Sequence, residues 1–218
     1  MRPSFVPLRF NLVDPHVHHD IKRTLQTMLE QLEWCQKALC NFLEEKRAKF
    51  PRFYFIGDDD LLEILGQAQN PAVIQAHLKK LFQGTPTVRF NKTMTKIQSM
   101  VSAAGEVVDL DHAVATSDRV EDWLSAFADE MKSTLASLLA SYLLSLTKTG
   151  EVNFEMYPSQ VMCIGELVQF TDSVEASIGN GFTDLLIKVK SQLAALTNQD
   201  LSAMPVVQIK VKALVMDL

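Results

Sequence analysis

Apolar residues recur at alternating steps of four and three in one stretch near the N-terminus. The series is Ile21, Leu25, Met28, Leu32, Cys35, Leu39 and Phe42. This spacing places all of these side chains along one stripe of an α-helix, as in helices that pack lengthwise in a coiled coil. Asp20 is the predicted N-cap, and Pro51 ends the helix because proline keeps the residue before it out of the α conformation. We therefore predict a rod roughly 40 Å long that packs on other helices.

Helical patterns also fill most of the remaining chain. The residues Asp58, Asp59 and Asp60 are predicted to cap a short helix, with Glu63 completing a capping box. Further helices are predicted after Asn70-Pro71, ending at Gly84; over about 119–146; after Tyr157-Pro158; and over about 183–197. The predicted buried stripe of the helix over 119–146 is Val120, Leu124, Phe127, Met131, Leu135, Leu138 and Tyr142, widened by Trp123 and Leu139. Residues 206–218 are apolar but too short to assign.

Two other stretches lack helical periodicity. Residues 50–55 (FPRFYF) are aromatic and are predicted to be an extended segment in the core. Residues 87–110 contain three short β-prone runs separated by turn residues, which predicts an antiparallel meander. The predicted fold class is therefore mainly α, with elongated helical bundles and a small β-meander insertion near 87–110. The predicted organisation is an irregular arm over 1–19 and a body over 20–218, helical over 20–84 and bundled over 118–218.

Composition excludes several classes of function. The formal net charge of −5 argues against nucleic-acid binding, which requires clustered lysine and arginine. No stretch reaches the roughly 20 apolar residues of a membrane span, and the N-terminus lacks the pattern of a signal peptide. The three cysteines, Cys35, Cys40 and Cys163, have no C-x-x-C spacing, which predicts reduced thiols in the cytoplasm.

Candidate catalytic motifs are weak. Residues 84–93 lack the second glycine of a phosphate-binding loop, so we predict no cofactor. Asp58, Asp59 and Asp60 lack the spacing of a calcium loop. The thiol of Cys163 is expected to be buried and inert, His77 and His112 stand alone in sequence, and no nucleophile motif is present. We predict no catalytic, cofactor-binding or metal-binding residue.

Several segments together resemble one known family. They are residues 35–39 (CQKAL), 43–47 (LEEKR), 50–55 (FPRFYF), 58–67 (DDDLLEILGQ), 77–82 (HLKKLF), 105–108 (GEVV), 120–124 (VEDWL) and 130–135 (EMKSTL). This series resembles the linker of dynein heavy chains, the region that precedes the first AAA+ module. Residues 157–163 (YPSQVMC), 169–175 (QFTDSVE) and 212–217 (KALVMD) are most similar to the cytoplasmic dynein 2, or intraflagellar-transport, subfamily.

The resemblance implies a mechanical role. In this family the linker arches over the AAA+ ring and bends as the ring hydrolyses ATP, which moves cargo along microtubules. The segment would be a non-catalytic relay for that motion, with Pro51, Gly57 and Gly84 as candidate breaks. The implied partners are the AAA+ ring, the dynein intermediate and light intermediate chains through the parent chain, and microtubules only indirectly. The implied locations are the cytoplasm, the cytoskeleton and the cilium, where the transport would be retrograde.

Two alternatives remain open on the sequence alone. The chain could be a stand-alone helical adaptor that binds a partner through its exposed apolar stripe and has no motor role. It could also be a metal-dependent enzyme using His16, His18 and His19, since imidazoles ligate zinc. No further ligand occurs near these histidines at a recognisable spacing, so a solvated histidine cluster is the preferred interpretation.

Overall fold

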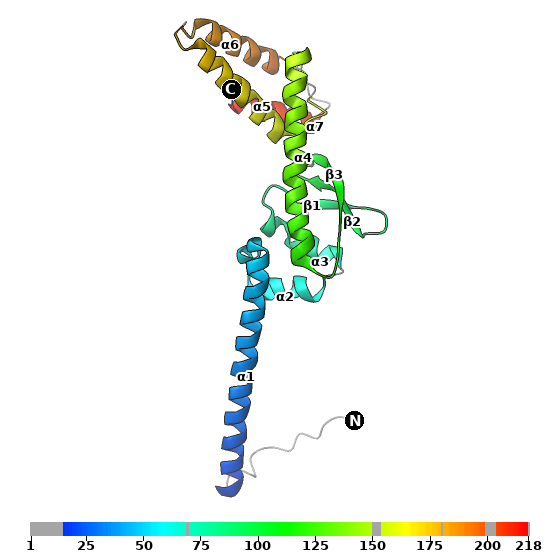
Figure 1. Cartoon of the computed structure of the whole chain (residues 1–218), viewed down its shortest axis with the longest axis vertical. Helices are drawn as coiled ribbons and strands as arrows, with labels where there is room; N and C mark the ends of the chain where they lie inside the picture. The colour runs from blue at the N-terminus through cyan, green and yellow to red at the C-terminus, as the bar shows by residue number, and fades with distance from the viewer. Residues whose placement is uncertain (1–14, 69, 150–153, 180, 199–203, 218) are drawn as a thin grey trace. The chain divides into compact units, whose positions relative to one another are not determined.

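The computed structural model describes residues 15–68, 70–149, 154–179, 181–198 and 204–217. The chain forms two compact units, residues 1–51 and residues 52–218. The described elements are mostly helices with a small three-stranded sheet (Figure 1). This confirms the predicted fold class, a mainly α protein with a β-meander.

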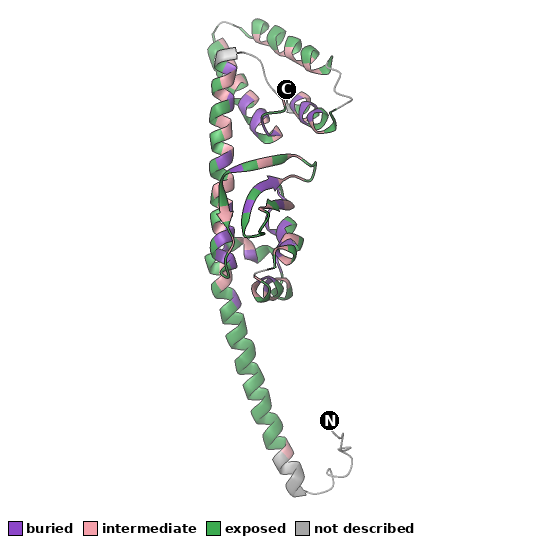
Figure 2. Cartoon of the chain, turned by 90° about the vertical axis from the view of Figure 1, so that its right-hand side faces the viewer, coloured by how far each residue is buried: buried purple, intermediate pink, exposed green. Residues whose placement is uncertain are grey.

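Unit 1 is built on the long helix α1 (Pro15–Lys49). The helix begins at Pro15, so the prediction that Asp20 is the N-cap is wrong. Proline suits the first helical position because its φ is already helical and its missing N–H has no partner to lose there. Of the predicted arm over 1–19, residues 1–14 lie outside the described residues. The predicted apolar stripe is largely exposed on this helix, with Leu25 at 60% and Leu32 at 66% (Figure 2).

The aromatic segment after α1 is a 3-10 helix, η2 (Pro51–Phe55), so the prediction of an extended segment is wrong. Three residues per turn direct only one of its aromatic side chains inward. Phe53 is fully buried, whereas Tyr54 and Phe55 are 55% and 69% exposed. Within η2, core packing is therefore limited to Phe53, and Phe50, just before η2, is also buried at 4% exposed.

The short helices α2 (Asp58–Gly66) and α3 (Pro71–Leu81) pack against each other in unit 2. The predicted capping box of α2 is wrong, because Gly57 is its N-cap and makes no side-chain bond. The three aspartates lie in the first turn instead, where negative charge suits the helix dipole. The predicted cap of α3 is confirmed: the Asn70 side chain accepts a hydrogen bond from the Ala72 N–H at 3.2 Å. Helix α3 ends at Leu81, before the predicted Gly84.

The sheet is an antiparallel meander of β1 (Thr87–Phe90), β2 (Lys96–Val101) and β3 (Val107–Ala115) in the order β1-β2-β3. It extends beyond the predicted end at residue 110. Ser99 pairs with Asp109 but Ile97 pairs with Val114, so β3 carries extra residues in an irregular bulge. Exposed, non-apolar residues within this bulge interrupt the alternation of apolar and polar positions along β3. The predicted strand therefore ended earlier than the observed one.

The bulge also ties the sheet to the long helix α4 (Val120–Thr149). The backbone N–H of Asp111 donates to Thr134 Oγ1 at 3.1 Å, and that of His112 donates to Glu130 Oε1 at 2.7 Å. Thr134 is buried in this contact. Side chains of α4 thus satisfy backbone groups in the irregular part of the strand ladder.

The first half of α4 is buried in the core formed with α3 and the sheet. Val120, Leu124 and Phe127 are fully buried and Trp123 is 3% exposed, as predicted. The rings of Phe127 and Phe82 meet edge to face at 5.3 Å. Phe82 is the C-cap residue of α3, so this contact joins α3 to α4.

The second half of α4 enters a separate core with α5 (Ser159–Ser177) and α7 (Pro205–Asp217). Its buried members are Tyr142, Leu146, Tyr157, Val161, Met162 and Leu214. The fully buried Tyr142 stacks edge to face on Tyr157 at 5.1 Å and donates a hydrogen bond to Glu166 at 2.9 Å. Burial raises the pKa of Tyr142 far above its usual range, and the nearby Glu166 carboxylate adds to this effect, so the hydroxyl stays protonated as a donor.

Helix α6 (Thr183–Thr197) contacts α5 and α7. Its bounds match the prediction, and none of its described residues is fully buried. It is therefore a peripheral element of unit 2.

Candidate functional site

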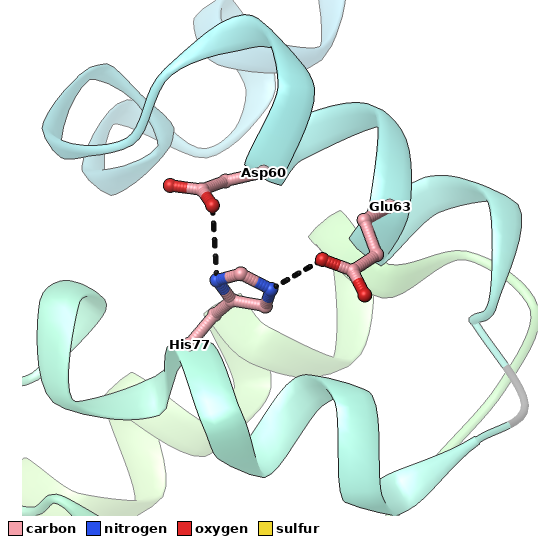
Figure 3. A group of neighbouring side chains, drawn as sticks. All are labelled: Asp60, Glu63 and His77. Atoms are coloured by element: carbon pink, nitrogen blue, oxygen red, sulfur yellow. Dashed lines mark hydrogen bonds and ion pairs between the residues drawn. The ribbon is translucent and has the colours of Figure 1, made fainter.

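A polar cluster lies between α2 and α3 (Figure 3). Asp60 and Glu63 are one turn apart on α2 and face His77, whose side chain on α3 is 10% exposed. The Nε2 atom of His77 lies 3.0 Å from Glu63 Oε2, and its Nδ1 atom lies 3.6 Å from Asp60 Oδ1. Each ring nitrogen therefore faces a different carboxylate.

Helical spacing explains why these groups meet. Residues three apart share a helix face, so Asp60 and Glu63 form one pair on α2, and His77 and Lys80 form another on α3. Lys80 Nζ donates to Asp60 Oδ2 at 2.7 Å. This hydrogen bond is the main cause of a lowered pKa for Asp60; partial burial opposes it, and attraction to Lys80 and His77 adds to it. Asp60 is therefore a carboxylate at neutral pH.

The Nδ1 atom of His77 is buried and has no hydrogen-bond partner. Its separation of 3.6 Å from Asp60 Oδ1 exceeds the length of an ordinary hydrogen bond. Because a carboxylate oxygen only accepts hydrogen bonds, His77 Nε2–H is the donor in the 3.0 Å contact with Glu63 Oε2. In the neutral imidazole this bond leaves the lone pair on Nδ1, facing Asp60.

A second polar cluster surrounds the buried Lys210 on α7. Its Nζ atom lies 2.9 Å from Glu106 Oε1 and donates to the backbone carbonyls of Tyr157 at 2.8 Å and Phe154 at 3.1 Å. Glu106 Oε1 also accepts the backbone N–H of Ser159 at 3.0 Å, at the start of α5. All three ammonium protons thus have acceptors, and α7, the β2–β3 turn and the start of α5 are joined.

A cleft of about 230 Å³ lies beside the first core of unit 2. Its lining includes Arg52, Phe82, Met100 and Met131. The Arg52 guanidinium lies 4.5 Å from the centre of the Phe82 ring and donates to the Leu81 carbonyl at 2.9 Å. Arg52 therefore closes the C-terminal end of α3 as well as forming one wall of the cleft.

The cysteines and histidines considered as candidate site residues lie in different surroundings in the structure. Cys35 and Cys40 are exposed, whereas Cys163 is only partly buried, against the second core. His16, His18 and His19 belong to α1, but their side chains lie outside the described residues. The absence of catalytic, cofactor-binding and metal-binding residues stays a prediction.

Sequence reasoning missed the partners of two histidines and the role of Lys210. His77 contacts both carboxylates of α2, and His112 Nδ1 lies 3.3 Å from Glu130, so neither is isolated. No local pattern connects these histidines to acidic residues many positions away. For Lys210 a signal existed, since it shares a helical stripe with the buried Val207 and Leu214.

Comparison with known proteins agrees with the resemblance seen in the sequence. Residues 8–142 match the family described as dynein heavy chain, N-terminal region 2. The chain is 48% identical over 209 residues to cytoplasmic dynein 2 heavy chain 1 of Tripneustes gratilla, covering 90% of this chain and 5% of that protein. It is 44% identical over 210 residues to the Homo sapiens protein of that name, and the match covers 92% of this chain and 5% of that protein.

The similarity extends to other dyneins. The axonemal heavy chain 5 of Rattus norvegicus is 36% identical over 193 residues, covering 83% of this chain and 6% of that protein. The chain spans about 5% of the length of the cytoplasmic dynein 2 relatives. None of the described helices is both long and apolar enough to cross a membrane. Because the family match covers more than half of its residues, the chain belongs to the dynein heavy chain family, in N-terminal region 2.

Proposed function

We propose that the chain is a non-catalytic mechanical part of a dynein linker, which relays conformational change of an AAA+ ring to microtubule-based transport. The similarity to cytoplasmic dynein 2 supports retrograde transport in cilia as the setting. The partners would be the AAA+ ring of the parent chain and, through that chain, the intermediate and light intermediate chains. Microtubules would be contacted only indirectly.

The observation that carries this proposal is the course of α4. This helix has 30 residues, which corresponds to about 45 Å. Its first half is buried with α3 and the sheet, and its second half is buried with α5 and α7. A single continuous helix shared by two cores resists bending, so a displacement at one core is transmitted to the other. That property suits a lever.

The candidate breaks would lie where no long helix continues. Pro51 falls at the boundary between the two compact units, which supports it as one such break. Gly57 precedes α2, and Gly84 lies between α3 and β1. These positions stay proposals for where the linker changes direction.

The stiffness of α4 can be tested in a full-length heavy chain that contains this segment. Ser137 is exposed at the start of the part of α4 that packs on the second core. Proline there removes a hydrogen bond to the preceding turn and kinks the helix in the turn that separates the two cores. We expect Ser137→Pro to slow microtubule gliding while the ring still hydrolyses ATP. Ser191→Pro in the peripheral helix α6 is the matched control and should slow gliding much less. Equal gliding speeds for the two variants would contradict the lever proposal.

The non-catalytic part of the proposal has a separate test. The purified chain alone should neither bind nor hydrolyse ATP, measured by calorimetry and phosphate release. Saturable binding of ATP to this chain would contradict it.

The exposed stripe of α1 favours a second candidate, a helical adaptor without a motor role. Leu25, Leu32 and Phe42 leave between 44% and 66% of their surface exposed. An adaptor would use this stripe to bind a partner and would take no part in force transmission. Replacing Leu25 and Leu32 by aspartate in the full-length heavy chain separates the two functions: the adaptor predicts loss of a partner with normal gliding, and the linker predicts impaired gliding.

A further inference from the structure

We propose that Asp60 and His77 bind a divalent metal ion of the zinc class, with Glu63 orienting the imidazole. This site does not depend on the proposed mechanical function. The sequence predicts no metal ligand here, because Asp60 and Glu63 were assigned to a helix cap and His77 has no acidic neighbour along the chain. Only the packing of α2 on α3 brings the three side chains together (Figure 3).

The two proposed ligand atoms are separated by nearly the distance expected for two ligands of one metal ion. His77 Nδ1 and Asp60 Oδ1 are 3.6 Å apart, which is too long for a hydrogen bond. Two ligands bound about 2.0–2.1 Å from a tetrahedral zinc ion are roughly 3.3 Å apart. A side-chain movement of a few tenths of an ångström would therefore be enough for both atoms to bind one ion.

The buried imidazole of His77 has one ring nitrogen without a hydrogen bond. Nδ1 is buried without a hydrogen-bond partner, so a neutral ring directs its lone pair at the Asp60 carboxylate. Two facing lone pairs are unfavourable unless a positive charge lies between them, and either a proton on Nδ1 or a metal ion bound to both atoms supplies that charge. The bond from Nε2 to Glu63 at 3.0 Å matches the carboxylate–histidine–metal arrangement, in which the second carboxylate fixes the tautomer.

The ligand types indicate the class of metal. One imidazole nitrogen with a carboxylate oxygen suits zinc, cobalt or nickel better than calcium or magnesium, which prefer oxygen alone. The carboxylates of Asp60 and Glu63 are 30% and 47% exposed, so water can supply the remaining ligands. All three candidate ligand atoms lie within 4.8 Å of one another.

Lys80 gives the proposal a distinctive consequence. Its ammonium lies 2.7 Å from the other oxygen of Asp60 and competes with a metal ion for the same carboxylate. Removing this charge should strengthen metal binding, whereas it would weaken a cluster held together by hydrogen bonds and ion pairs alone.

The test is a titration of the whole chain with zinc and with cobalt, by calorimetry and visible absorption. His16, His18 and His19 are first replaced by alanine, so that they cannot contribute a site. We expect one saturable site, lost in His77→Ala and Asp60→Asn, weakened about 10–100-fold in Glu63→Gln and strengthened several-fold in Lys80→Met. Asp59→Asn, next to the site on an exposed position, should bind as the parent does. The cobalt spectrum should lack the intense band of thiolate ligands.

A signal from the His77 imidazole reports metal binding, and a separate measurement reports whether each variant is folded. The ¹⁵N chemical shift of His77 Nδ1 should change when zinc is added, while far-UV circular dichroism of each variant confirms that it is folded. Absence of saturable binding, binding that survives His77→Ala in a folded variant, or a His77 Nδ1 signal that ignores zinc would each overturn the proposal.

Discussion

Helices α1 and α4 are the two longest of the described helices, with 35 and 30 residues, and both carry apolar residues at helical spacing. On α4 the stripe is covered, with Val120, Leu124 and Phe127 fully inaccessible and its members over 131–139 half-buried. On α1 the equivalent stripe is exposed, with Leu32 at 66%. Both helices form because the apolar spacing and the absence of internal proline permit them. Among the residues that the structure describes, only α4 has neighbours within its own unit that cover its stripe.

The difference teaches that an apolar stripe predicts a helix and a need for a partner, without identifying the partner. Burial of apolar surface contributes roughly 25 cal/mol per Å², and most of the stability of helices in proteins comes from this packing. In unit 1, α1 depends on local terms, such as Lys46, Arg47 and Lys49 in its last turn, which suit the helix dipole. The stripe of α1 is therefore the part of the chain most dependent on further contacts.

The two tryptophans test this contrast with the largest expected effect. Trp123 on α4 is 3% exposed and Trp34 on α1 is 72% exposed. We expect Trp123→Ala to lower the free energy of unfolding by about 3–5 kcal/mol, because a large cavity replaces the indole. Trp34→Ala should change it by less than about 0.5 kcal/mol. Urea denaturation followed by circular dichroism measures both, and a large effect of Trp34→Ala would mean that α1 has a partner in solution.

The far end of α4 can be tested through Lys210. Lys210→Met leaves Glu106 without its ammonium partner in a largely buried site, which should cost about 3 kcal/mol. Adding Glu106→Gln should recover part of that loss, because no unpaired charge is then buried. A double-mutant cycle by denaturation measures the coupling, and additive effects of the two changes would show that the ion pair does not hold α7 in place.

The packing of α5 on α4 predicts a smaller effect. A Cβ atom at Gly165 would collide with the ring of Tyr142, whereas a Cβ at Gly66 would enter open space. Gly165→Ala should therefore destabilise the protein by about 1–3 kcal/mol, since the buried tyrosine must move. Gly66→Ala should be neutral or stabilising by up to about 1 kcal/mol. Thermal denaturation of the two variants compares them directly.

The smallest effect is expected from the exposed ion pair of Asp60 with Lys80. In the folded protein the pKa of Asp60 lies below its ordinary value of 3.8. The ion pair therefore stabilises the fold at pH values above 3.8, and this contribution is lost as the pH falls through the lower pKa of the folded state. We expect Asp60→Asn to be less stable than the parent at pH 7 and equal to it at strongly acidic pH. Asp59→Asn is the control. A difference between Asp60→Asn and the parent that does not depend on pH would contradict this assignment.

Much of the architecture was predictable because it depends on residues close together in sequence. The cap of α3 at Asn70 and the bounds of α6 follow from turn residues and helical period, and both predictions hold. The predicted stripe of α4 holds at both ends of the helix, while its members over 131–139 are half-buried. The short motifs also indicated the dynein heavy chain family, which the family match confirms. The wrong predictions fall where one local pattern is compatible with two structures. In η2, for example, an aromatic run forms a 3-10 helix instead of the predicted extended segment.

Tertiary structure decided the polar sites and the coverage of each helix. His77 lies beside Asp60 and Glu63 only because α2 packs on α3, and Lys210 lies beside Glu106 only because α7 reaches the β2–β3 turn. The bonds from the β3 bulge to Thr134 and Glu130 likewise join distant segments. The sequence by itself determined the periods, the caps and the family, because each of these is set by neighbouring residues or by whole motifs. Pairings between residues far apart in the chain leave no local pattern, so only the packed structure could establish them.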